Sequence, residues 1–326
     1  PMSMEMLSYL CNNDPSKNGD DKKQNLVKAP FTDYKYFTYT NDTLVIDTTL
    51  SLEKEYAFNI LRKDMFGYQE FANQGKTYTP LKADFEEASI YSQMGTKSKD
   101  YNFYNKEDIV YYKVPTPSSE AAYRTGIEQG QFLDVLFTSN FSERFNATLA
   151  YKGLRSLGEY RYSLSSQAAL RFSSNYQTKN NRYRLRLHYV GQNLFNEENG
   201  GLTEQSKASF ESEDPNFKDR GRLEVNLNNA SSKLEGKRIF VDQSYSFLSK
   251  KDSISQKVTD LNLGYELVYD WRKYRFDQDS PESNGIFGPS FTSDAIADRT
   301  WLEEFDNKVY LNFNSPYVLG DFEVYA

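Results

Sequence analysis

The chain lacks the residues from which most metal centres and hydrolytic active sites are built. It has one cysteine and one histidine, Cys11 and His188, among 326 residues. A single cysteine excludes an intrachain disulfide, and these two residues cannot supply a zinc ligand set. Glycine-rich phosphate loops and nucleophile–histidine–acid patterns are also absent from the sequence. We therefore expect no enzymatic activity, no catalytic residues, no metal site and no cofactor.

Long apolar runs are absent as well. Hydrophobic residues make up 38% of the chain, and its mean hydropathy is −0.76. No run of about 18 uncharged apolar residues occurs, which excludes helical membrane spans. A β-barrel is not excluded, because half the residues of its strands face the lumen and are polar. The net charge of −7 argues against nucleic acid as a partner.

What the sequence does have is strict alternation, seen most clearly over residues 182–192. Successive side chains of a strand point to opposite faces. Here tyrosine and leucine alternate with three arginines and His188. Three arginines on one face are not buried without partners, so that face lies in water or among carboxylates. The apolar face then rests on an apolar surface, either a protein core or lipid.

The same alternation recurs from Gly126 to the last strand-like segment, and it divides the strands into two faces. The residues predicted to face lipid are Phe145, Leu149, Tyr151, Leu170, Phe172, Tyr183, Leu185, Leu187, Tyr189, Leu263, Tyr265, Leu267, Tyr269 and Trp271. Those predicted to line the lumen, mainly as a basic strip, are Arg144, Lys152, Arg171, Arg182, Arg184, Arg186, His188, Asn146 and Gln167. The strip either attracts anions or pairs with carboxylates of the N-terminal segment or of the acidic stretch 193–220.

The connections between strands favour a transmembrane barrel over a sandwich. Short ones (141–143, 178–181, 250–256 and 315–320) alternate with longer charged ones (153–164, 193–236 and 278–303). Barrels in outer membranes have short periplasmic turns and long outer loops, whereas a Greek-key sandwich has no such parity. Residues 222–228, although strand-like, should therefore belong to a loop.

The predicted fold class is all-β: a transmembrane antiparallel β-barrel, an up-and-down meander, preceded by a small irregular or β N-terminal module. We expect residues 1–29 to be a flexible polar tail and 30–120 to be a plug or periplasmic module. Residues 121–326 should form barrel strands with long extracellular loops at 193–236 and 278–303, and we expect the chain to supply part of a barrel.

Several short motifs resemble the putative porin family of Bacteroidota outer membranes. The matching stretches are residues 46–52, 58–64, 114–120, 128–131, 150–156, 178–183, 197–202, 236–238 and 287–292. The resemblance runs from about residue 28 to the end of the chain. It implies an outer-membrane β-barrel of a Gram-negative bacterium with a non-barrel N-terminal segment.

Three functional hypotheses follow. The first is a porin-like barrel for passive diffusion of small polar or anionic solutes, with outer-membrane lipid and other envelope proteins as further partners. The second is a structural or accessory subunit of a larger outer-membrane complex, such as secretion or motility machinery. The third is a soluble carbohydrate-binding β-sandwich, against which the loop parity argues.

Overall fold

The structure is a computed structural model that describes part of the chain. The described residues are 29–49, 51–82, 94, 96, 99, 101–126, 128–212, 215–251, 258–281, 287, 295–315 and 322–325. The chain divides into two compact units, residues 1–30 and 31–326. The predicted flexible tail, 1–29, therefore lies outside the described residues except for Ala29.

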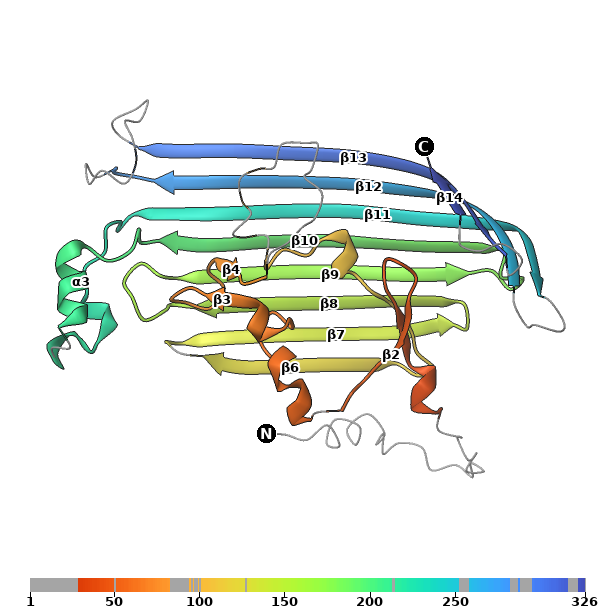
Figure 1. Ribbon diagram of the computed structural model, residues 1–326, viewed down its shortest axis with the longest axis horizontal. Helices are drawn as coiled ribbons and strands as arrows, with labels where there is room; N and C mark the ends of the chain where they lie inside the picture. Colours follow the sequence, from red (N-terminus) through yellow and green to blue (C-terminus); the bar gives the residue numbers. More distant parts are fainter. Residues whose placement is uncertain are drawn as a thin grey trace, which may run out of the picture. The chain divides into compact units, whose positions relative to one another are not determined.

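A nine-stranded antiparallel sheet dominates the second unit (Figure 1). Its strands are β6 (Ser118–Gly126), β7 (Gly130–Ser142), β8 (Phe145–Ser156), β9 (Ser165–Gln177), β10 (Tyr183–Glu198), β11 (Ala230–Lys251), β12 (Val258–Gln278), β13 (Ile296–Asn314) and β14 (Phe322–Tyr325). Each strand pairs with the strands before and after it in the sequence, so the sheet is an up-and-down meander with β6 and β14 at its edges. This confirms the predicted all-β fold class.

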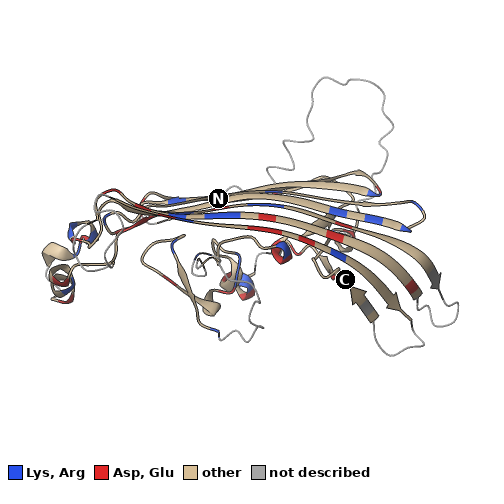
Figure 2. Ribbon diagram, turned by 90° about the horizontal axis from the view of Figure 1, so that it is seen from above, with Lys and Arg blue, Asp and Glu red and all other residues tan. Residues whose placement is uncertain are grey.

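Residues 31–113 form the N-terminal module, which is largely irregular. Its described residues include four 3-10 helices and five strands of three residues each: η1 (Phe31–Asp33), β1 (Lys35–Phe37), β2 (Thr43–Val45), η2 (Leu52–Ala57), η3 (Met65–Gly67), β3 (Tyr68–Glu70), β4 (Tyr78–Pro80), η4 (Lys106–Asp108) and β5 (Tyr111–Lys113). The strands make two small sheets, β2-β1-β5 and β3-β4. Figure 2 shows the module on one side of the large sheet, so module and sheet form a single compact unit.

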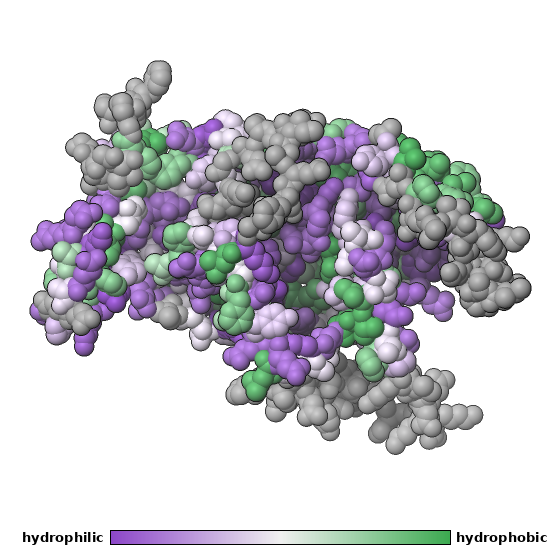
Figure 3. All heavy atoms as spheres, viewed as in Figure 1, coloured by the Kyte–Doolittle hydropathy of each residue, from purple (hydrophilic) through white to green (hydrophobic). Residues whose placement is uncertain are grey.

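The two faces of the large sheet differ as the alternation predicts. The face toward the module buries polar side chains such as Asn146, His188 and Asp242. Apolar contacts on this face are few: Phe103 packs on Leu194 and Leu234, and a second cluster forms around Tyr111. Figure 3 shows hydrophilic side chains over much of this side of the molecule. The opposite face exposes leucine, phenylalanine and tyrosine.

The strands are longer than the sequence predicts. β10 and β11 stay paired up to Glu198 and Ala230, and β12 and β13 up to Gln278 and Ile296. The strands therefore leave residues 199–229 and 279–295 between them, shorter stretches than the predicted 193–236 and 278–303. Charged residues continue the ladder there because strand pairing needs only backbone groups. Residues 222–228 do belong to the loop, as predicted, and helix α3 (Glu204–Glu211) lies in the same loop.

The start of the wall also differs from the prediction. β6 begins at Ser118 and pairs with β7, from Ser118↔Thr138 to Gly126↔Gly130. The sequence showed no strand there because β6 has few apolar residues and most of them are exposed. No helix among the described residues is long and apolar enough to cross a membrane.

Candidate functional site

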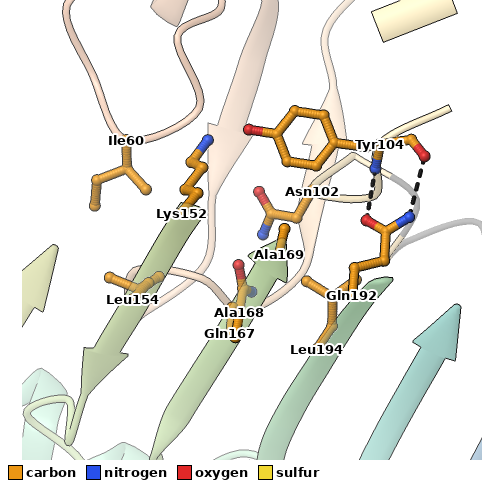
Figure 4. A pocket seen from close by; sticks show the side chains of 10 residues that line it. All are labelled: Ile60, Asn102, Tyr104, Lys152, Leu154, Gln167, Ala168, Ala169, Gln192 and Leu194. Carbon is orange, nitrogen blue, oxygen red and sulfur yellow. Dashed lines mark hydrogen bonds between the residues drawn. The ribbon is translucent and has the colours of Figure 1, made fainter. Parts of the chain in front are cut away.

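The candidate site is the contact between the N-terminal module and the sheet face that we call the inner wall. Amide side chains of the wall bond the extended backbone of the module. Gln192 accepts from the Tyr104 amide at 2.9 Å and donates to the Tyr104 carbonyl at 3.0 Å (Figure 4). Asn175 donates to the carbonyl of Tyr112 at 2.7 Å. No described strand of the module pairs with the wall, and wall side chains bond backbone groups of the module instead.

A second group of polar contacts lies where β8, β9 and β10 end. Asn73 of the module donates to the carbonyls of Ser156 and Ser163, at 3.2 and 2.7 Å. The carbonyl of Gly75 accepts from Asn196 at 3.1 Å and also from Gln167. These bonds fix the segment between β3 and β4 against the wall.

Two buried ion pairs cross the wall and also hold the module. Arg186 on β10 pairs with Asp242 on β11 at 2.7 Å, and Arg238 on β11 pairs with Asp270 on β12 at 2.6 Å. Both arginines are almost completely buried. Arg186 also donates to the carbonyls of Thr38 and Tyr39, and Arg238 to the carbonyl of Tyr104. The charges thus have the partners that burial requires, and some of these partners belong to the module.

The carboxylate of Glu266 on β12 provides a third link. It accepts a hydrogen bond from the Tyr39 hydroxyl at 3.0 Å and pairs with the Lys106 ammonium at 3.4 Å. Lys106 also lies 4.9 Å from the centre of the Tyr39 ring. The module contributes both the donor and the cation, and the wall contributes the acid.

A lysine of the module, Lys99, is buried where β9 begins and β10 ends. Lys99 donates to Asn196 at 2.7 Å and lies 3.3 Å from a Glu198 oxygen. Burial lowers the pKa of Lys99, and the Glu198 carboxylate partly opposes that effect. One wall carboxylate therefore holds a cation that has little access to water.

The outer face has the opposite character. The predicted lipid-facing residues of β8, β9, β10 and β12 all lie on it, since they pair with one another in register, as Leu149 does with Phe172. Leu149 is 51% exposed although it is a leucine in the middle of a strand. A surface of this kind requires an apolar neighbour. Contact with lipid remains a prediction.

The sheet, its polar inner wall and its apolar outer face agree with the comparison to known families. The family model for putative porins matches residues 30–325. The chain belongs to the putative porin family. The match covers both the N-terminal module and the wall, so both are parts of the family's architecture. No curated protein and no solved structure matches the chain.

Family membership brings with it a porin-like function at the outer membrane in general terms. Within the described part of this porin-family chain, no group of three histidine, cysteine, aspartate or glutamate residues could hold a metal ion.

Two residues of the predicted basic strip do not lie on the wall. Arg144 and Arg182 are exposed in the turns just before β8 and β10. Alternation alone could not show this, because a turn residue next to a strand continues the same parity. Arg144 and Arg182 therefore lie outside the paired strands, and their place in the lumen stays a prediction.

The other members of the strip lie on the inner wall, but most are covered by the module or bonded to neighbours. Asn146 bonds Thr138 and Asn140 of β7, and His188 bonds the Tyr111 hydroxyl of the module. Arg171 pairs with Asp134 on β7 at 3.3 Å. Arg184 is exposed and lies 3.4 Å from the side-chain oxygen of Asn41. Among the described residues Arg171 and Arg186 of the strip are therefore paired with carboxylates, whereas Lys152 and Arg184 form no ion pair.

The acidic partners of Arg171 and Arg186 come from neighbouring strands, not from the acidic stretch 193–220 that the sequence favoured, although Glu198 of that stretch pairs with Lys99 of the module. Asp134, Asp242, Glu266 and Asp270 were missed. Each occupies an inward position of its strand, and Asp242 lies directly opposite Arg186 in the register. Opposite charges at matching inward positions of consecutive strands were the signal that could have found them.

Proposed function

We propose that this porin-family protein is an outer-membrane β-barrel for passive diffusion of small polar solutes, with a passage narrowed by its own N-terminal module. The observation that carries the proposal is the polar inner wall, whose contacts with the module are mainly hydrogen bonds and ion pairs, with two small apolar clusters beside them. Polar contacts of this kind exchange with water and solutes, as the lining of a passage must.

The distribution of charge favours small polar solutes in general over strongly charged ones. Arg186 and Arg238 are matched by Asp242 and Asp270. Arg184 is an exposed cation of the inner wall, near the short-turn end. A modest anion preference set by Arg184 is therefore part of the proposal. The outer face would contact outer-membrane lipid of a Gram-negative bacterium of the Bacteroidota type.

The test is the ion preference of the full-length, detergent-purified protein in a planar bilayer under a salt gradient. Arg184→Glu should shift the reversal potential toward cations while leaving expression unchanged. Arg144→Glu is the matched control, because it makes the same charge change at an exposed residue in a turn. Equal reversal potentials for wild type and Arg184→Glu would show that Arg184 does not line the passage.

A second candidate is a structural subunit of a larger envelope complex. It is favoured by the burial of the Arg238–Asp270 pair. Arg238 is only 2% exposed and also donates a hydrogen bond to the module. Buried pairs resist separation. A folded, inserted protein that passes no current would contradict diffusion and support this second function.

A further inference from the structure

Three cations of the module and the wall gather around one carboxylate at the inner wall. Asp134 on β7 lies 3.3 Å from Arg171 of β9 and 3.5 Å from Arg62 of the module. Lys152 on β8 is directly opposite Asp134 in the register, yet it forms no ion pair with any described residue. Arg62 is shared with Glu120 at 2.9 Å. The three positive charges of Arg62, Lys152 and Arg171 therefore face the two negative charges of Asp134 and Glu120.

Tyr104 of the module lies among these cations. The Arg171 guanidinium is 4.4 Å from the centre of its ring, and the Lys152 ammonium is 5.6 Å from the same centre. The Nε–H of Arg171 is buried and has no hydrogen-bond partner among the described residues. An unpaired donor and an unpaired ammonium beside one ring are costly unless something compensates them.

A cavity next to this group has room for a compensating ion. Its volume is about 20 Å³, which is enough for one water molecule or an ion of similar size. Figure 4 shows the Lys152 ammonium and the Tyr104 hydroxyl close together on one side of the cavity, with Asn102 below them and Gln167 farther away, next to Ala168. Leu154 and Leu194 supply an apolar floor.

We infer that this cavity is a binding site for one small monatomic anion of the chloride type. Lys152 supplies the charge, and the Tyr104 hydroxyl donates to the anion. Water would fill the same volume but would leave the excess positive charge unmatched. Because Lys152 belongs to the wall and Tyr104 to the module, a bound anion would hold the two together. The inference does not require that the protein conduct.

The first test is crystallographic. The full-length protein is crystallised in bromide, and the anomalous difference map is inspected near Lys152. A bromide peak within hydrogen-bond distance of the Lys152 ammonium is expected. A site that holds water, or nothing, overturns the inference. This measurement uses the wild-type chain and so does not depend on how any variant folds.

The second test is thermal unfolding of the detergent-solubilised protein in chloride and in gluconate at equal ionic strength. Wild type should unfold about 2–4 °C higher in chloride, the shift expected for an anion at roughly ten times its Kd. Lys152→Gln should lose this difference. Lys106→Gln should keep it, since the charge of Lys106 is already paired with Glu266.

Equal unfolding temperatures in the two salts would overturn the inference. A chloride effect that survives in Lys152→Gln would also overturn it. A bromide peak without a chloride-dependent unfolding temperature would mark an adventitious ion only.

Discussion

Tyr111 of the N-terminal module and His188 of β10 share a hydrogen bond of 2.8 Å between the Tyr111 hydroxyl and Nδ1 of His188. Each residue is only 1% exposed. The His188 ring stacks on Phe240, with ring centres 4.6 Å apart. The single histidine of the chain is thus a docking residue for the module. A histidine held in this way differs from a solvent-facing lumen residue.

Replacing Tyr111 by phenylalanine should weaken the docking of the module. The change leaves Nδ1 of His188 without its partner, in a ring whose Nε2 already has none among the described residues. An unsatisfied buried group costs about 1–2 kcal/mol. Urea unfolding of the solubilised protein measures the loss. Tyr112→Phe is the control, because Tyr112 bonds the wall through its backbone carbonyl. Equal losses in both variants would contradict a specific role for the hydroxyl.

Removing Arg186 should be among the most damaging single changes on the wall. Arg186→Ala leaves the Asp242 carboxylate buried with only the Tyr310 hydroxyl, which donates to it at 2.8 Å. Breaking a buried pair on one side costs about 3–5 kcal/mol. Arg184→Ala, two residues earlier on the same face, should cost less than about 1 kcal/mol because Arg184 is exposed. Equal unfolding free energies for Arg186→Ala and Arg184→Ala would refute the special cost of removing Arg186.

Alkaline pH should release the module before it disrupts the rest of the chain. Burial raises the pKa of Tyr104, and likewise that of Tyr68, to about 12. In the unfolded module these hydroxyls ionise near the ordinary tyrosine pKa of 10.0. The folded state then keeps protons that the unfolded state loses. The contribution of these two hydroxyls to the stability of the folded module is therefore full below pH ~10 and falls as pH rises through ~12.

Limited proteolysis across this pH range measures the release of the module. Cleavage within residues 31–113 should increase above pH ~10, and the increase should be smaller in Tyr104→Phe, which has no hydroxyl to ionise. Cleavage that does not change with pH, or that changes equally in wild type and Tyr104→Phe, would disprove the link to Tyr104.

A charge on the outer face should impair insertion. Leu149 lies mid-strand, opposite Phe137 and Phe172 in the register. Arginine near the middle of a bilayer on the lipid face of a barrel costs about 2–4 kcal/mol. Leu149→Arg should therefore reduce folding into lipid vesicles, whereas Ser142→Arg, at an exposed strand end, should not. Normal folding of Leu149→Arg would mean that this face does not contact lipid.

The faces of the wall could be read from the sequence because strand alternation has a period of two. Tyr183 to Tyr189 and Leu263 to Trp271 show this most clearly, since their alternate residues pair with residues of the same face on the next strand. Loop order was also readable, because turn residues and charge clusters interrupt the pattern. The ends of strands were not, as Arg144 and Arg182 show.

The contacts of the module could not be predicted. Residues 31–113 lack a regular period, and Gln192 meets the Tyr104 backbone across 88 positions. Pairings over such separations depend on where an irregular segment comes to rest, which no local pattern encodes. The carboxylates that pair with the wall arginines could not be predicted for a related reason. Arg238 and Asp270 can be recognised as partners only when the register between β11 and β12 is known.

The most direct measurement is the frequency of large single-channel openings in wild type and in Tyr111→Phe, with Tyr112→Phe as control. If the docked module narrows the passage, wild type should show small currents with rare large openings. Losing about 1–2 kcal/mol of docking should make those openings about 5–30-fold more frequent in Tyr111→Phe and leave Tyr112→Phe unchanged. Steady large currents in wild type, or identical opening frequencies in all three proteins, would contradict a module-restricted passage.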